Sequence, residues 1–358
     1  MKIGIITIFD PVANYGNKLQ NYAVNQVMQN MKFDVQTLYV EKQLNSVKEN
    51  IKHLIHKNTG YYFANDKNFW KHHYIKIKKF ALFNNKYIPN KQIKLFDNLS
   101  EQYDYFVVGS DQVWNPSWYD ELKKEAFLLN FAKSHQKICF SPSFGVSEIP
   151  DKWKEHFKKS LESFPNVSVR EEAGANIVKE LTGKTAEVLI DPTLMLDKEE
   201  WIKIESKPQK LSFKQDYILT YFLGNKSKKQ EDYIKKIASE NNLLIYNLCD
   251  YNQPDLFTAD PSEFIYLVHN AKIVFTDSFH ACVFAFIFTK PFQVFPRNGA
   301  EANMMSRIET LLNKFSLQRK LYGKIENDLF ECNYSKGYEQ LYREREKVNK
   351  FLNKSLSL

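Results

Sequence analysis

A short polar turn between two apolar segments carries the residues of this chain that could most readily do chemistry. An apolar run leads into residues 276–280, which read Thr-Asp-Ser-Phe-His, and an apolar stretch resumes at once. Asp277 and Ser278 are close enough in sequence to orient the ring of His280, as general acid or base catalysis requires. A histidine that opens an apolar helix can also be a hydrogen-bonded core residue. We favour a catalytic His280, with Asp277 as the orienting residue.

A second polar turn follows the apolar run 105–108 and reads Gly-Ser-Asp-Gln-Val-Trp-Asn-Pro over residues 109–116. Glycine lets a backbone approach a ligand closely, and polar groups at the carboxyl edge of a parallel sheet are where open α/β folds bind ligands. The alternative is an ordinary capped turn with a core tryptophan. We favour a ligand site, because a cap needs fewer hydrogen-bonding side chains than this turn supplies.

Two further strand ends carry groups that suit an anion. The segment Asn14-Tyr15-Gly16 precedes a predicted helix whose free N–H groups attract anions, although capping by Asn14 explains the pattern equally well. Arg170 follows the run 167–169, and its guanidinium suits a carboxylate or phosphate; a structural salt bridge is the alternative. Asp191 ends the next strand, and we interpret it as a turn cap.

The elements that must position these turns alternate between short β-branched runs and longer amphipathic stretches, the pattern of βαβ units around parallel sheets. Strands are predicted at 3–9, 35–40, 105–108, 137–140, 167–169, 188–190, 217–223, 243–247, 272–276 and 291–295. Helices are predicted at 18–31, 153–163, 172–181, 227–240, 262–270, 279–288, 303–315 and 338–352. Residues 41–99 show helical periodicity without a clear strand and are interpreted as a helical insertion.

The fold class that follows is α/β, with two Rossmann-like doubly wound domains facing a cleft. A polar, lysine-rich junction at 205–210 separates residues 1–204 from 211–333, and residues 334–358 form a last helix that could pack back on the first domain. A chain of 358 residues exceeds what one hydrophobic core usually supports, which agrees with two domains.

Composition narrows the class of protein further. Its longest apolar run is far shorter than a membrane span, and its start lacks the pattern of a signal peptide, so we expect a cytoplasmic protein. The four cysteines are widely separated and form no Cys-x-x-Cys pair, so neither disulfides nor a metal site are expected. No Gly-x-Ser-x-Gly elbow supports a hydrolase, and no Gly-x-Gly-x-x-Gly supports a dinucleotide site.

The net charge of +8 is densest between residues 42 and 94, where lysine and histidine alternate with aromatic residues. We favour a solvated helical face over a nucleic-acid site, because no nucleic-acid-binding motif accompanies it. Attraction to anionic lipid head groups or to a lipid-diphosphate substrate at the inner face of the membrane is an intermediate interpretation.

Taken together, these motifs resemble the polysaccharide pyruvyl transferase family. The matching pieces, in family order, are Asn14-Tyr15-Gly16, residues 108–116, Ser143-Phe144-Gly145, Ser168-Val169-Arg170-Glu171, Asp191-Pro192-Thr193, residues 276–280 and Lys290-Pro291-Phe292. The resemblance implies a two-domain fold like that of GT-B glycosyltransferases. It also implies phosphoenolpyruvate as donor, without a further cofactor, and a sugar or lipid-linked oligosaccharide as acceptor, with pyruvate joined to two hydroxyls as a ketal.

On this resemblance, His280 would protonate the methylene carbon of the donor, and Asp111 would accept a proton from the acceptor. The donor would be held by Arg170, Ser278, Lys290, Arg297 and Arg307. The acceptor would face Asn14, Tyr15, Gly16, Ser110, Gln112, Trp114 and Asn115. No metal is required.

The chain departs from the family at Ser278, where some branches carry an arginine two residues before the histidine. The donor is then held by Arg297 or Arg307, or it is not phosphoenolpyruvate. The alternative function is that of a GT-B glycosyltransferase that uses a nucleotide sugar in cell-surface polysaccharide synthesis. A catalytically silent glycan-binding protein is a third interpretation.

Overall fold

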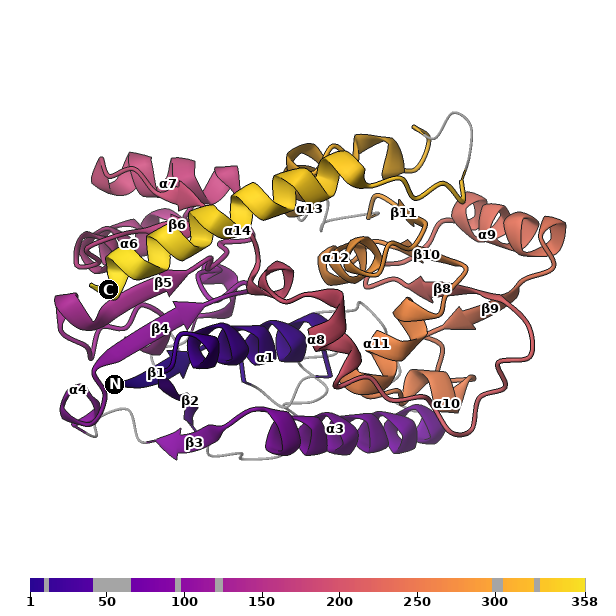
Figure 1. Ribbon diagram of the computed structural model, residues 1–358, viewed down its shortest axis with the longest axis horizontal. Helices are drawn as coiled ribbons and strands as arrows, with labels where there is room; N and C mark the ends of the chain where they lie inside the picture. The colour runs from indigo at the N-terminus through magenta and orange to yellow at the C-terminus, as the bar shows by residue number, and fades with distance from the viewer. Residues whose placement is uncertain are drawn as a thin grey trace.

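The computed structural model describes residues 1–9, 13–40, 66–93, 98–119, 125–297, 305–324 and 329–357. Their strands form two larger parallel sheets and one short pair, with helices packed around them (Figure 1). The α/β fold expected from the sequence, with two Rossmann-like sheets, is therefore confirmed. The two larger sheets fall on either side of residues 205–210, while the domain boundaries themselves stay a prediction.

The first sheet has the strand order β3-β2-β1-β4-β5, and all of its pairs are parallel. Its strands are β1 (Lys2–Ile6), β2 (Asp34–Val40), β3 (Asn90–Ile93), β4 (Tyr105–Gly109) and β5 (Lys137–Phe140). Alternate residues of β1 pack into different apolar clusters: Ile3 and Ile5 into one, Ile6 into the other. The sheet is thus covered on both faces, which explains its continuous apolar strands.

Strand β3 corrects the sequence prediction for residues 41–99. The four residues of β3 pair with β2, although their sequence, Asn-Lys-Gln-Ile, has no apolar run that would mark a strand. The register with β2, rather than local propensity, makes this edge strand. Helix α3 (Lys67–Tyr87) confirms the helical part of that prediction, while residues 41–65 and 94–97 lie outside the described residues.

The second sheet has the order β11-β10-β8-β9 and is also parallel. Its strands are β8 (Tyr217–Tyr221), β9 (Leu244–Asn247), β10 (Ile273–Thr276) and β11 (Phe292–Val294). Its helices are α9 (Lys228–Glu240), α10 (Pro254–Phe257), α11 (Pro261–His269), α12 (Phe279–Ile287) and α13 (Met305–Lys314). All nine residues of α12 are buried, as an apolar sequence on every side of a helix requires.

Shorter segments and further helices complete the two halves. They are α1 (Tyr15–Asn30), α4 (Leu99–Gln102), α6 (Asp151–Glu162), α7 (Glu172–Thr182), α8 (Lys198–Ile202), the short strands β6 (Ser168–Val169) and β7 (Glu187–Val188), and the 3₁₀ turns η1 (Pro116–Trp118), η2 (Ser134–Gln136), η3 (Pro192–Met195) and η5 (Gln318–Lys320). Ser168 Oγ donates to the Cys139 carbonyl at 2.7 Å, which joins β6 to β5. No described helix is both long and apolar enough to cross a membrane.

The last helix, α14 (Ser335–Ser355), lies along both halves of the molecule (Figure 1). Its Tyr338 hydroxyl donates to the Phe286 carbonyl of α12, and its Arg345 donates to the carbonyls of Leu194 and Leu196 in the first half. Helix α14 therefore contacts both halves of the molecule.

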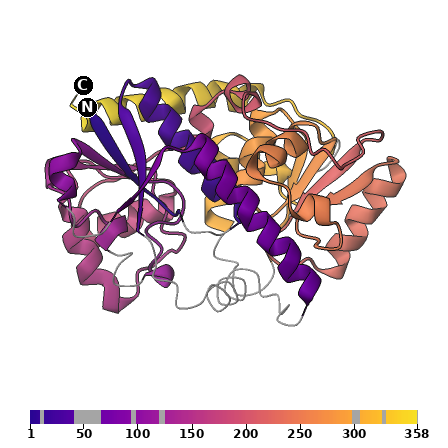
Figure 2. The ribbon, with the colours of Figure 1, turned by 90° about the horizontal axis from the view of Figure 1, so that it is seen from below.

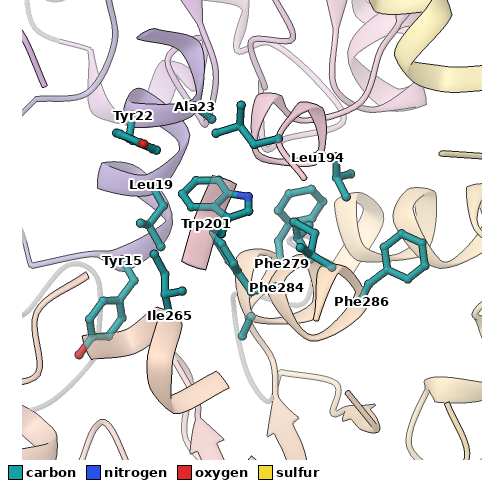
Figure 3. Close-up of a cluster of buried hydrophobic side chains, with 14 of the residues drawn as sticks. Tyr15, Leu19, Tyr22, Ala23, Leu194, Trp201, Ile265, Phe279, Phe284 and Phe286 are labelled. Atoms are coloured by element: carbon teal, nitrogen blue, oxygen red, sulfur yellow. The ribbon is translucent and has the colours of Figure 1, made fainter. Parts of the chain in front are cut away.

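One apolar core joins the two halves. Figure 3 shows Trp201 of α8 between side chains of α1 and α12, and its ring lies 4.8 Å from that of Phe284. Tyr15 of α1 stacks on Phe264 of α11 at 4.5 Å. These shared contacts set the position of α1 relative to α12, and the first turns of these two helices carry the site.

Candidate active site

The imidazole of His280 lies against the first turn of α1. A methyl group placed on Gly16 would come within 2.0 Å of His280 Nδ1, so only a glycine leaves room for the ring. Gly16 lies in the first turn of α1. The N–H groups of a first turn have no intrahelical carbonyl to which they can donate. The ring therefore lies beside a helix end that favours negative charge.

Asp191 is the carboxylate beside this ring. Its Oδ2 lies 3.6 Å from His280 Nε2 and accepts hydrogen bonds from Arg170 Nη1 at 2.6 Å and Ser110 Oγ at 3.0 Å. Burial raises the pKa of Asp191, but the His280 and Arg170 contacts outweigh burial and lower it overall. Asp191 also caps η3 by accepting from Thr193 N, as the sequence predicted, yet its second oxygen links the two halves at the site.

Asp111 lies at the centre of the charged groups and has a strained backbone, with φ of 61°. Its carboxylate is 3.5 Å from Arg170 Nη2 and 4.0 Å from Arg307 Nη1, and it accepts a hydrogen bond from Asn17 Nδ2 at 3.3 Å. Burial raises the pKa of Asp111, but the neighbouring positive charges, Arg170 first, lower it overall. Asp111 is therefore ionised at neutral pH.

The two arginines beside Asp111 have hydrogen-bonding capacity to spare. Arg170 and Arg307 are only 4% and 6% exposed, yet Nε and Nη2 of Arg170 and Nε of Arg307 have no hydrogen-bond partner in the part of the chain that the structure describes. Burial, followed by repulsion from Arg170, lowers the pKa of Arg307 to about 10. Buried guanidinium groups that are this incompletely paired are suited to binding an anion.

Gln112 lies beside Arg307. With its amide oxygen turned toward the guanidinium, that oxygen is 3.0 Å from both Nη1 and Nη2. Gln112 thus positions Arg307. Asn115 caps η1, where its side-chain oxygen accepts from Ser117 N at 3.0 Å.

The structure corrects the prediction that Asp277 orients His280. The Asp277 carboxylate accepts from the backbone N–H groups of Leu223 and Gly224 at 2.7 and 2.8 Å, and Arg297 Nε donates to it at 3.1 Å. Asp277 therefore holds the loop after β8 and balances the charge of Arg297. It is Asp191, more distant in sequence, that lies beside the His280 ring.

Three residues expected to contact the acceptor are instead part of the core. Tyr15, Ser110 and Trp114 are fully buried. The Tyr15 hydroxyl donates to the Ala259 carbonyl at 2.9 Å, and the Trp114 indole donates to the Phe127 carbonyl at 3.0 Å. Ser110 donates to Asp191 and so positions that carboxylate. For Trp114, the alternative of a core tryptophan is the correct one.

Lys290 is also wrong as a donor ligand. It precedes β11, and its charged neighbours are Lys198, Asp216 and Lys272, two of which lie just before β8 and β10. It therefore lies at the amino edge of the second sheet, opposite His280. Asn14 caps α1 by accepting from Asn17 N at 3.2 Å, which is the alternative that the sequence left open.

The Ser278 side chain forms no cap hydrogen bond at the start of α12, although its N–H donates to Thr276 Oγ1 at 2.9 Å. Ser278 is 4% exposed and precedes Phe279, whose ring lies 4.6 Å from the Arg170 guanidinium carbon. Ser278 is therefore next to the same cluster.

Glu171 was missed as a supporting residue. Its Oε1 accepts from Ser143 Oγ, Phe144 N and Gly145 N at 2.8 to 3.2 Å, so the side chain after Arg170 fixes the turn that follows β5. The sequence did offer a signal for Glu171, because this acidic residue directly follows Arg170, a candidate anion ligand. Among the described residues, no group of three or more His, Cys, Asp or Glu side chains could hold a metal ion.

A sequence profile decides the family. The profile of the polysaccharide pyruvyl transferase family matches residues 14–298, which include every residue of the cluster except Arg307. This chain belongs to the polysaccharide pyruvyl transferase family. Arg307 lies beyond the matched region, so this pyruvyl transferase family member draws part of its site from a helix outside the profile. No curated protein sequence matches the chain.

Several solved structures match the chain at low similarity. UDP-GlcNAc 2-epimerase from Neisseria meningitidis, bound to UDP-GlcNAc, is 11% identical with a TM-score of 0.45 over 99% of this chain and 100% of its own. A glycosyltransferase from Rickettsia africae is 12% identical with a TM-score of 0.42 over 99% and 98%. A functionally uncharacterized protein from Klebsiella pneumoniae is 17% identical with a TM-score of 0.38 over 69% and 86%. These similarities are too low to support an argument about activity.

Proposed function

We propose that this family member transfers pyruvate from phosphoenolpyruvate to a sugar of a polysaccharide or of its lipid-linked precursor. The observation that carries the proposal is that buried N–H groups of Arg170 and Arg307 have no hydrogen-bond partner among the described residues. Both guanidinium groups flank Asp111 in the cluster that contains His280. An anionic donor would complete the hydrogen bonding of both guanidinium groups. Because phosphoenolpyruvate is made in the cytoplasm, we propose that the reaction takes place there.

The donor's carboxylate and phosphate would be divided between Arg170 and Arg307. Arg297 is the weaker candidate of the sequence-based set, because Asp277 already balances its charge at 3.1 Å. Arg307 would then supply the positive charge that other branches carry at the position of Ser278. This supports phosphoenolpyruvate as the donor despite the serine.

His280 would act as the general acid. Its Nε2 faces Asp191 at 3.6 Å without a hydrogen-bond partner among the described residues, and its Nδ1 lies against Gly16. A proton would pass from the imidazolium to the methylene carbon of the donor, which becomes a methyl group, and the adjacent carbon becomes electrophilic. Arg170 and Arg307 would offset the negative charge of the donor as this happens.

An acceptor hydroxyl would then attack the electrophilic carbon while Asp111 accepts its hydrogen bond. Because the pKa of Asp111 is lowered, we assign it to orienting the hydroxyl and the neutral His280 to taking up the proton. The carbon–oxygen bond to phosphate breaks, and a second hydroxyl of the same sugar attacks that carbon while its proton passes to the departing phosphate. The products are the pyruvate ketal and inorganic phosphate.

The test is incubation with phosphoenolpyruvate and candidate glycan acceptors. We expect phosphate release together with an acceptor whose mass increases by one pyruvyl ketal, and neither product from His280→Gln. If a nucleotide sugar is consumed instead, with release of a nucleoside diphosphate, the proposal is wrong and the protein is a glycosyltransferase.

A further inference from the structure

The outward face of helix α3 is unusually basic. This 21-residue helix contains no Asp or Glu. Two of its lysines are used internally: Lys76 is buried, and Lys79 pairs with Glu263 at 2.8 Å. Its other lysines are all exposed and form no ion pair with a described carboxylate: Lys67, Lys71, Lys78 and Lys86.

Large apolar side chains are interspersed among these lysines. Tyr74, Ile75 and Leu82 are 56%, 38% and 67% exposed, and they are three of the six large hydrophobic residues exposed in the described part of the chain. With Lys71 and Lys78 they recur at three- and four-residue spacings and so share one side of the helix. We call these lysines and apolar residues together the α3 outer face.

The opposite side of α3 connects this face to the candidate site. Phe80 packs on Tyr15 with ring centroids 5.1 Å apart, and Tyr15 precedes Gly16, against which His280 lies. Figure 1 shows α3 along the lower edge of the molecule, and Figure 2 shows it running diagonally across the face seen from below. The α3 outer face is therefore separated from the active-site turn of α1 by a single packed layer.

We propose that the α3 outer face binds the surface of a membrane that contains anionic lipids. Each lysine near such a surface contributes about 1 kcal/mol, and the absence of acids from α3 removes local repulsion. The exposed Leu82 and Ile75 favour lipid over nucleic acid, because aliphatic side chains can enter the boundary between head groups and acyl chains. This inference deepens the proposed use of a lipid-linked acceptor, but membrane binding needs no substrate.

The experiment is co-sedimentation with vesicles of phosphatidylglycerol mixed with phosphatidylcholine, and with phosphatidylcholine alone. We expect binding to the anionic vesicles only, weakened by high salt. Replacing Lys67, Lys71, Lys78 and Lys86 with glutamine should lower the partition coefficient about 100-fold or more. Replacing Tyr74, Ile75 and Leu82 with serine, at unchanged charge, should lower the binding that persists at high salt.

The matched control is helix α9, where Lys228, Lys229, Lys235 and Lys236 are also exposed. The same four changes to glutamine there alter net charge equally and should leave vesicle binding within about threefold of wild type. Equal loss in the α3 and α9 variants, or no binding by wild type, would overturn the proposal. So would an α3 variant that loses affinity for single-stranded RNA while retaining its affinity for vesicles.

Unfolding curves of each variant check that the fold persists, as expected for exposed side chains. Because vesicle binding is measured without donor or acceptor, a negative result here leaves pyruvyl transfer untouched. A protein that binds vesicles but releases no phosphate from phosphoenolpyruvate would support membrane binding and contradict the proposed pyruvyl transfer.

Discussion

His280 Nε2 lies 3.6 Å from Asp191 Oδ2, so an imidazole of the second half of the molecule faces a carboxylate of the first. The same oxygen accepts from Arg170 at 2.6 Å. One buried carboxylate thus sets the position of both the proposed acid and the proposed donor ligand. The site can form only when the two halves are packed together.

Asp191→Asn is expected to impair this arrangement. The amide cannot balance the charge of Arg170, and breaking a buried pair in this way costs about 3 kcal/mol of unfolding free energy. We expect kcat to fall about 100-fold because the His280 ring loses its orienting charge. Urea denaturation and steady-state kinetics measure the two effects. The exposed Asp216→Asn is the control, and an unchanged kcat in Asp191→Asn would refute the positioning role.

Gly16→Ala should displace the imidazole, because the added carbon would lie 2.0 Å from His280 Nδ1. We expect kcat to fall about tenfold or more, with a smaller effect on stability. In a protein that already carries His280→Ala, Gly16→Ala should lower kcat little further, because both substitutions act through the same ring. Additive losses would contradict this contact. Gly174→Ala, whose new carbon meets Phe144 at 3.0 Å, should change stability without changing kcat.

Arg307→Met should separate stability from function. Burial lowers the pKa of Arg307 to about 10, so keeping its charge buried costs about 3 kcal/mol, at about 1.4 kcal/mol per pKa unit. We expect the ligand-free variant to gain about 2 kcal/mol in unfolding free energy while its KM for phosphoenolpyruvate rises about tenfold. Lower stability with an unchanged KM would exclude Arg307 from the donor site. The exposed Arg319→Met should change neither quantity.

Stability should fall in acid through Asp111 and Asp191. Both have a pKa lowered below 3.8 in the folded protein, so each stabilises the fold above its unfolded pKa. That stabilisation is lost as the pH falls below about 4 through the folded values, because the unfolded state then binds more protons. Unfolding free energy measured from pH 6 to pH 3 should drop less in Asp191→Asn than in wild type. The exposed Asp216→Asn should leave the curve nearly unchanged, and equal slopes in all three proteins would contradict the expectation.

The sequence located most elements and the main polar turns, because each turn directly follows an apolar strand. It located His280, Arg170 and Asp111, and it named Arg307 among the weaker cations. It missed β3, which is polar and depends on its pairing with β2. It also assigned to a ligand the side chains of Tyr15 and Trp114, whose polar groups are satisfied by the carbonyls of Ala259 and Phe127.

By itself the sequence determined the α/β class, the family motifs and the edge of each sheet at which polar groups collect, since these depend on local patterns. Only the tertiary structure decided how those groups are divided between the site and the fold. In the folded chain, Asp277 binds the backbone of the loop after β8, and Asp191 lies beside the His280 ring. Lys290 lies at the opposite edge of the second sheet. Hydrogen-bond partners and burial are set by residues that lie far apart in the chain, and no local pattern encodes them.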